Sequence, residues 1–153
     1  MGYLNNPSAT ASTYDSDGYL HTGDLGSISS TGFITIHDRL KELIKVRGHP
    51  VPPATLEDIL HGHPLVADVA VIGVPDEYSG EVPQAWVVLT KEGKGEVVRG
   101  DLERLVEKRL PKWMRLKGGV VFVDEVPKSR AGKILRRVIR EKAKLMGEVK
   151  PKL

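Results

Sequence analysis

Three clusters of polar residues in this sequence have types and spacings that could do chemistry. In the first, Thr22-Gly23-Asp24, a carboxylate directly follows a glycine between two strand-like pieces. An Asp in such a turn most often hydrogen-bonds to its own backbone. Its two acceptor oxygens would also suit the two hydroxyls of a ribose. The cluster therefore leaves two alternatives, a turn-forming residue and a nucleotide contact.

The second cluster, residues 38–48, alternates charged and apolar side chains in the order DRLKELIKVRG. This pattern is typical of a solvated strand edge, where lysines also oppose edge-to-edge aggregation. Four bases next to a glycine would equally suit a surface that meets phosphate. The bases are Arg39, Lys41, Lys45 and Arg47, followed by Gly48.

The third cluster is the basic stretch PKSRAGKILRR, residues 127–137. Its Gly132-Lys133 pair stands just before an expected helix, where a flexible backbone could present an ammonium group to a reacting anion. A phosphate-binding P-loop is excluded, because the first glycine of that pattern and the Ser/Thr after its lysine are missing. The remaining alternative is a basic start to a helix.

The composition is that of an ordinary globular protein of 153 residues, with 40% hydrophobic and 28% charged residues. Such a chain can form one domain, or one domain with an appendage, and bury a core. The absence of Cys excludes a disulfide scaffold, thiolate zinc sites and cysteine nucleophiles. No run of residues approaches the roughly 20 apolar positions of a membrane span.

The net charge of +3 is unevenly distributed along the chain. Residues 127–153 contain ten Lys or Arg and two Glu, a net of +8, so the remainder carries −5. A basic block of this kind could hold a phosphate-bearing ligand, nucleic acid or a membrane surface. It could also be a solvated basic helix with no ligand.

Residues 1–37 are rich in turn-forming residues and have little helical periodicity. We expect a single turn near residues 7–11 and short strand-like pieces at 19–21 and 33–36. These pieces cannot enclose a core on their own. They look like hairpins that belong to a larger β-rich body.

From Asp38 onward the pattern predicts an α+β domain with a three-stranded sheet and helices packed on one face. A small hairpin is expected around residues 43–51, and a helix that opens at Pro52-Pro53 and ends at Gly62. β-Branched runs indicate the three strands, and apolar stripes to be buried against the sheet indicate two further helices. The strands are at 66–74, 82–89 and 119–123, and the helices at 98–110 and 134–146.

In this order and spacing, the clusters resemble the C-terminal part of the AMP-forming acyl- and aryl-CoA synthetases. That adenylating family includes firefly luciferase and nonribosomal peptide adenylation domains. The similarity covers nearly the whole chain and is of the 4-coumarate–CoA ligase-like type. The stretches that carry it are GYLNNPSATAST, DGYLHTGDLG, GFITIHDRLKELIKVRG, LEDILHGHPLVADVAVIGVPDEYSGEVPQAWVV and PKSRAGKILRR.

The resemblance implies a two-step reaction with a role for each cluster. A carboxylate first attacks the α-phosphate of ATP, and a thiol, usually that of CoA, then displaces AMP. Lys133 would contact the carboxylate and the α-phosphate during adenylation. Asp24 would hold the ribose hydroxyls, with Arg39 as a second nucleotide contact. Lys41 would be the hinge about which the small domain swings between the two steps.

After that swing, the resemblance places Lys45 at the active site for the second half-reaction. Gly48 would let the pantetheine arm of CoA approach the backbone. Mg²⁺ would arrive with ATP, since the chain has no metal-ligand constellation of its own. The implied domains are 1–39, the end of the large adenylating domain, a hinge at 40–41, and the mobile domain at 42–153.

The family's phosphate loop, adenine pocket and acyl pocket have no counterpart in this sequence. We therefore expect a C-terminal fragment that is inactive alone and whose carboxylic acid substrate cannot be named. One alternative is an adenylating enzyme that serves a carrier protein. Another is a non-enzymatic module with a basic tail, although Phe122 is the last aromatic residue, which argues against single-stranded nucleic acid as a partner.

The location is inferred from the resemblance and from the last three residues. We expect a cytoplasmic enzyme. The terminal Pro151-Lys152-Leu153 resembles the Ser-Lys-Leu peroxisomal address, which makes a peroxisomal location the alternative.

Overall fold

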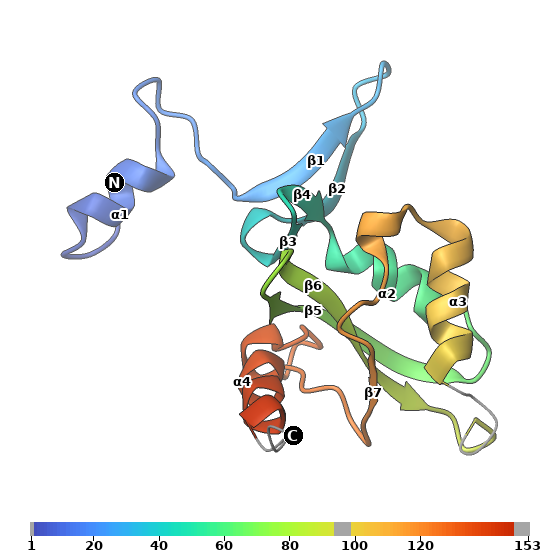
Figure 1. Cartoon of the computed structure of the whole chain (residues 1–153). Helices are drawn as coiled ribbons and strands as arrows, with labels where there is room; N and C mark the ends of the chain where they lie inside the picture. Colours follow the sequence, from blue (N-terminus) through green and yellow to red (C-terminus); the bar gives the residue numbers. More distant parts are fainter. Residues whose placement is uncertain (1, 94–98, 149–153) are drawn as a thin grey trace. The chain divides into compact units, whose positions relative to one another are not determined.

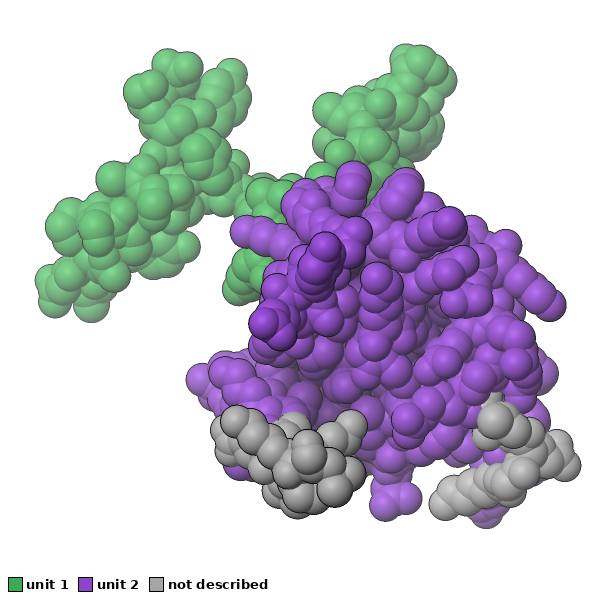
Figure 2. All heavy atoms as spheres, in the orientation of Figure 1, with its two compact units in different colours: residues 1–41 green, residues 42–153 purple. Residues whose placement is uncertain are grey.

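The computed structural model describes residues 2–93 and 99–148 and divides the chain into two compact units. Unit 1 is Met1–Lys41 and unit 2 is Glu42–Leu153 (Figure 2). Val98 of an expected helix and the terminal Pro151-Lys152-Leu153 lie outside the described residues. None of the described helices has the length and apolar character of a membrane span.

Unit 1 contains a short helix, α1 (Pro7–Thr13), where the sequence predicts only a turn. Two local features favour the start of this helix. The N-cap residue Asn6 accepts a hydrogen bond from the Ala9 N–H at 3.0 Å through its side chain, and Pro7 occupies the first turn. None of its residues is buried. A capped first turn therefore accounts for a helix that has no apolar face to anchor it.

An antiparallel hairpin of β1 (Asp24–Ile28) and β2 (Ile34–Arg39) forms the rest of the regular structure in unit 1. The predicted piece at 33–36 is confirmed as part of β2. The piece predicted at 19–21 is not a strand, because Leu20 forms only an isolated bridge with Tyr14. β1 was not predicted, because its residues show no clear alternation of apolar and polar side chains. A 3-10 turn, η1 (Leu40–Glu42), comes directly after β2.

Unit 2 is built on one sheet of five strands rather than the predicted three. The three predicted strands are present, and the hairpin predicted at 43–51 joins them because Val46 pairs with Gly80. The spatial order is β4-β3-β6-β5, with β7 parallel to β6. The strands are β3 (Ile44–Val46), β4 (His49–Val51), β5 (Val66–Asp76), β6 (Gly80–Leu89) and β7 (Val120–Phe122).

Helices cover both faces of this sheet (Figure 1), whereas the sequence pattern predicted one covered face. Along β5, Val69 and Val71 pack in one core cluster with α2 (Pro53–His61) and α3 (Arg99–Arg109). Ala70 and Ile72 point to the other face and pack against α4 (Arg136–Glu148). A strand that is apolar at consecutive positions requires cover on both sides. The α+β class is confirmed, and the one-sided arrangement is wrong.

The last helix begins at Arg136, later than predicted. Ile134 forms a bridge with Lys128, and the Leu135 N–H donates to the Pro127 carbonyl at 2.9 Å, so these residues close a loop instead of starting the helix. The expected burial of Leu145 and Met146 is also wrong, because they are 64% and 52% exposed. The buried part of the helix is its first half, around Ile139.

Candidate active-site residues

Asp24 and Arg39, the two predicted nucleotide contacts, are in direct contact in unit 1. They face each other in the register of β1 and β2, and Arg39 Nε lies 2.8 Å from Asp24 Oδ1. The guanidinium also donates to the Thr22 carbonyl at 3.3 Å. Half of the Arg39 side chain remains exposed. The pair presents acceptor and donor atoms together at the base of the hairpin, an arrangement that could bind hydroxyl groups.

Lys41, the predicted hinge, is exposed within η1 and is the last residue of unit 1. The residue after it, Glu42, belongs to unit 2, where its carboxylate accepts a hydrogen bond from Arg140 Nη2 at 3.0 Å. The chain therefore passes from one unit to the other at Lys41, and its next residue is attached to α4.

Lys45 and Gly48 lie in the β3–β4 hairpin. Lys45 is the exposed residue between buried Ile44 and Val46, and its backbone N–H donates to Glu81 Oε2 at 2.9 Å. Arg47 and Gly48 form the two-residue turn with positive φ angles of 50° and 80°. These values are typical of a type I′ hairpin turn, in which glycine is favoured. A Cβ added to Gly48 would meet no atom within 4 Å, so the space beside this backbone is open.

A basic groove runs along this hairpin, and the sequence pattern indicated no role for most of its residues. The side chain of His49 stacks on Trp113 with ring centroids 5.1 Å apart, and Arg47 lies over the ring of Tyr78 at 5.0 Å. The cavity has a volume of about 370 Å³. We call it the hairpin groove; its lining residues are Val46, Arg47, His49, Lys112, Trp113, Arg115 and Lys117. The signal that could have found it is the short run of bases around Trp113.

Lys133 lies in a tight loop before α4, and its side chain is exposed. The loop is closed by Ser129, whose N–H donates to the Lys133 carbonyl at 2.8 Å and whose Oγ accepts from the Lys133 N–H at 3.2 Å. Gly132 adopts the positive φ of 78° that this closure needs. Lys128, at the base of the loop, contacts Asp68 through an ion pair of 2.6 Å.

The Lys133 loop and the β3–β4 turn are attached near opposite ends of β5. The loop is tied to Asp68, near the beginning of that strand. The turn is tied to Ser79, beyond its end, because the Arg47 N–H donates to the Ser79 carbonyl at 2.8 Å. Extended chain from Asp68 to Asp76 spans about 26 Å. The structure therefore does not bring the two predicted lysine sites together.

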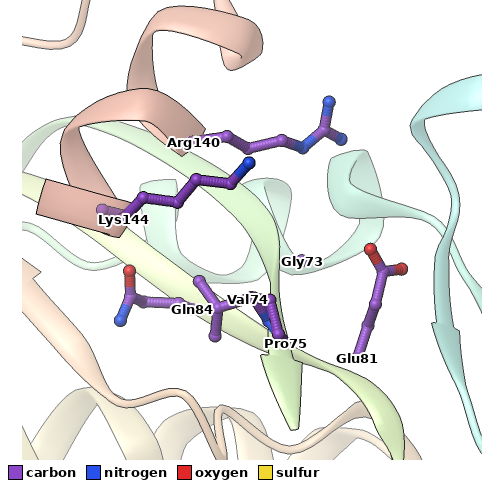
Figure 3. Close-up of a pocket in the computed structure, with 8 residues that line it drawn as sticks. Gly73, Val74, Pro75, Glu81, Gln84, Arg140 and Lys144 are labelled. Carbon is purple, nitrogen blue, oxygen red and sulfur yellow. The ribbon is translucent and has the colours of Figure 1, made fainter. Parts of the chain in front are cut away.

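A second cavity, of about 610 Å³, lies between α4 and the sheet (Figure 3). Arg140 and Lys144 extend over it from the helix, and Glu81 lies on the opposite side above the floor formed by Val74 and Pro75. No sequence motif indicated a role for these residues. Within the described ranges, no three His, Cys, Asp or Glu side chains are grouped so that they could hold a metal ion.

The α+β unit with its basic loop and hairpin matches a known class of protein. Residues 55–133 match the model of the AMP-binding enzyme C-terminal domain, and this chain belongs to that family. The resemblance that the three clusters indicated is therefore confirmed.

Individual relatives agree with this assignment. The chain is 48% identical to 4-coumarate–CoA ligase 1 of Arabidopsis thaliana over 141 residues, covering 92% of this chain and 25% of that protein. It is 49% identical to a luciferin 4-monooxygenase of Luciola mingrelica with the same coverage. The crystal structure of ATP-bound MatB from Rhodopseudomonas palustris matches with a TM-score of 0.86 and 34% identity, over 95% of this chain and 28% of that one. The chain thus spans about a quarter of the length of these curated relatives.

Proposed function

We propose that this chain is the C-terminal part of an ATP-dependent, AMP-forming carboxylic acid–CoA ligase and acts with a large adenylating domain. One observation carries the proposal: the Lys133 loop is tied to Asp68 near the start of β5 and the β3–β4 turn to Ser79 beyond its end, and the extended strand from Asp68 to Asp76 spans about 26 Å. A single active site could meet only one of them at a time. Two successive half-reactions need such an alternation.

In the first half-reaction, a carboxylate oxygen attacks the α-phosphorus of ATP and pyrophosphate leaves. Two anions must approach each other, so a well-aimed positive charge lowers the barrier. We assign this role to Lys133, because it is exposed at the tip of a loop that is closed at its base. Asp24 and Arg39 would contact the ribose hydroxyls of the nucleotide. Mg²⁺ would enter with ATP.

In the second half-reaction, the CoA sulfur attacks the acyl carbon and AMP leaves. The hairpin groove supports CoA as the thiol, because CoA carries several phosphates and an adenine ring. Four bases and the exposed ring of Trp113 line the groove next to the open backbone of Gly48. Lys45, in the same β3–β4 hairpin, would act in this half-reaction. The unit boundary after Lys41 supports that residue as the hinge.

A carrier-protein thiol is the second candidate acceptor for the acyl group. The C-terminal domain family and the equal similarity to a ligase and a monooxygenase support adenylate chemistry without fixing which acceptor takes the acyl group afterwards. The four bases of the hairpin groove favour a polyanionic free thiol such as CoA. The identity of the carboxylic acid depends on a pocket that we assign to the large domain.

The decisive experiment is a chimaera in which this chain replaces the matching 141-residue region of the Arabidopsis 4-coumarate–CoA ligase 1. Pyrophosphate exchange into ATP measures adenylation, and CoA consumption from synthetic acyl-adenylate measures thioester formation. Lys133→Ala should lower the first rate on the order of 10²-fold or more and spare the second. Gly48→Leu should do the reverse, because a side chain there enters the space proposed for the thiol.

The matched control is Lys108→Ala, which removes the same charge from the exposed last turn of α3. It should change neither rate. The 153-residue chain alone should show no turnover, because we assign the pocket that positions ATP and acid for attack to the large domain. Equal losses of both rates on Lys133→Ala would contradict the division of roles, and turnover by the free chain would contradict the need for a large domain.

A further inference from the structure

The most enclosed ion pair of the described residues lies three positions after Lys133. Arg136, the first residue of α4, directs Nη2 at both carboxylate oxygens of Glu57, at 2.7 and 2.8 Å. Both side chains are only 13% exposed. Glu57 lies on α2, so the pair joins two helices that cover opposite faces of the sheet.

The same two side chains also hydrogen-bond to the backbone N–H and carbonyl of Val71 at the edge of the sheet. β5 is the last strand in the spatial order, so one edge of it has no neighbouring strand. Glu57 Oε1 accepts from the Val71 N–H at 2.8 Å, and Arg136 Nε donates to the Val71 carbonyl at 3.3 Å. Buried main-chain groups need such partners. Arg136 is therefore fixed to a strand edge as well as to a carboxylate.

The contact of Arg136 with Val71 is the second point at which the Lys133 loop is attached to β5. The loop is tied to β5 at Asp68 through Lys128, on the side that enters it. On the side that leaves it, the loop is tied to β5 at Val71 through Arg136. Between these two points the loop is closed by the bridge of Lys128 with Ile134. The backbone that carries Lys133 is thus held at both ends by the same strand.

We propose that Arg136, through Glu57 and Val71, is a positioning residue that sets the placement of Lys133 for adenylation. This inference rests on the proposed function of Lys133. A lysine at position 136 could not replace the arginine, because one ammonium cannot present the fixed fork that meets the carboxylate and the carbonyl together. A shift of about 1 Å in a catalytic group can cost on the order of 10²-fold in rate.

The first test uses Arg136→Lys in the chimaera described above. Pyrophosphate exchange should fall between about 10-fold and 10²-fold in kcat, with a smaller change in the KM for ATP. Thioester formation from supplied acyl-adenylate should stay within about twofold. The matched control is Arg137→Lys, because Arg137 is the adjacent residue of the same helix and its side chain is 88% exposed. That variant should change neither rate.

The second test measures amide hydrogen exchange in the free 153-residue chain. Arg136→Lys should speed the exchange of the Ser129 and Leu135 amides, which donate to the Lys133 and Pro127 carbonyls, by at least tenfold. The Ala85 amide, which donates to the Gly119 carbonyl within the sheet region, should keep its rate. Glu57→Gln, which retains an acceptor for Val71 but removes the charge, should act in the same direction.

The outcomes separate this inference from the proposed function. If Lys133→Ala leaves adenylation intact, the proposed function fails, whatever Arg136 does. If Lys133→Ala strongly lowers the adenylation rate but Arg136→Lys changes neither that rate nor the exchange rates of the loop amides, the positioning role is overturned. Equal loss of both half-reactions together with faster exchange at Ala85 would also overturn it, because that pattern indicates general loss of structure.

Discussion

The two units of this chain differ in where they place their apolar side chains. All the fully buried hydrophobic residues among those described, from Ile44 to Ile139, belong to unit 2. The hairpin of unit 1 instead exposes Ile28, Phe33 and Ile34, which are 73%, 75% and 69% accessible. Unit 2 therefore carries its own core, whereas the hairpin offers an apolar surface that another part of a larger protein could cover.

One ion pair from each unit shows a related difference, although unit 2 also has exposed pairs such as Arg137–Glu141. In unit 1, the Asp24–Arg39 pair leaves half of the arginine exposed, and an exposed pair of this kind stabilises a fold by about 0–1 kcal/mol. In unit 2, the Glu57–Arg136 pair is nearly enclosed, and removing one partner of a buried pair costs about 3–5 kcal/mol. The exposed half of the Arg39 side chain is thus accessible to a ligand, whereas the Glu57–Arg136 pair is enclosed in the fold.

Separating the units gives the largest expected effect. Residues 42–153 should fold alone and unfold cooperatively in urea, because their strands and helices enclose two core clusters. Residues 1–41 alone should show no cooperative transition, since none of their described side chains is buried. Circular dichroism and amide dispersion in NMR spectra check both pieces. A cooperative transition in residues 1–41 would show that unit 1 also folds around a core of its own.

Truncating one aromatic side chain in each unit should give unequal losses of stability. Trp86 in β6 is 2% exposed, and Trp86→Ala should lower the free energy of unfolding by about 3–5 kcal/mol. Phe33→Ala should change it by less than about 0.5 kcal/mol, because that ring is 75% exposed. Urea unfolding of the full chain measures both values. Comparable losses would mean that the hairpin packs against something within this chain.

Within unit 2, a local turn should matter less than the core. Gly48→Ala places a side chain at a φ of 80° without any clash, so backbone strain alone should cost about 1–2 kcal/mol. The matched control is Gly100→Ala in α3, where the added Cβ would lie 3.6 Å from Arg104 Nη1. That change should stabilise the chain by about 0.4–1 kcal/mol. If Gly100→Ala is destabilising as well, the loss on Gly48→Ala cannot be attributed to the positive φ of Gly48.

The smallest expected effect is a dependence on pH at the turn between β5 and β6. Hydrogen bonds from the backbone and side chain of Ser79, followed by that from the Tyr78 N–H, lower the pKa of the Asp76 carboxyl. A carboxyl whose pKa is lowered by folding contributes stability above its unfolded pKa, and that stability is lost as the pH falls through the folded value. The loss should therefore appear below about pH 4.

Asp76→Asn should remove part of that acid sensitivity, because the variant lacks near neutral pH the stability that the charged carboxylate contributes, and the two proteins should converge at low pH. The measurement is urea unfolding of both proteins from neutral pH down to well below the ordinary Asp pKa of about 3.9. The Ser79 carbonyl of this turn accepts a hydrogen bond from the Arg47 N–H at 2.8 Å, so the turn also helps to hold the β3–β4 hairpin. Identical pH profiles for the two proteins would show that Asp76 does not contribute.

Much of this protein is determined by short stretches of sequence. The helix opening at Pro52-Pro53, the β-branched runs at 66–74 and 82–89, and the Arg47-Gly48 turn depend on residues that are neighbours in the chain. Local preferences decide such features before any tertiary contact forms. The motifs around Asp24 and Lys133 likewise indicated the family, which the comparisons confirm.

Other features depend on residues that only the fold brings together. The two additional strands β3 and β4 join the sheet because Val46 meets Gly80, and the start of α4 depends on Lys128 bridging Ile134. Glu57 and Arg136 are 79 positions apart, yet they share one enclosed contact. No local pattern shows which carboxylate such an arginine will meet, because the choice is made by how α2, β5 and α4 pack. The sequence therefore determined the element types and the family, and only the tertiary structure decided which charges are committed to one another and which remain free for chemistry.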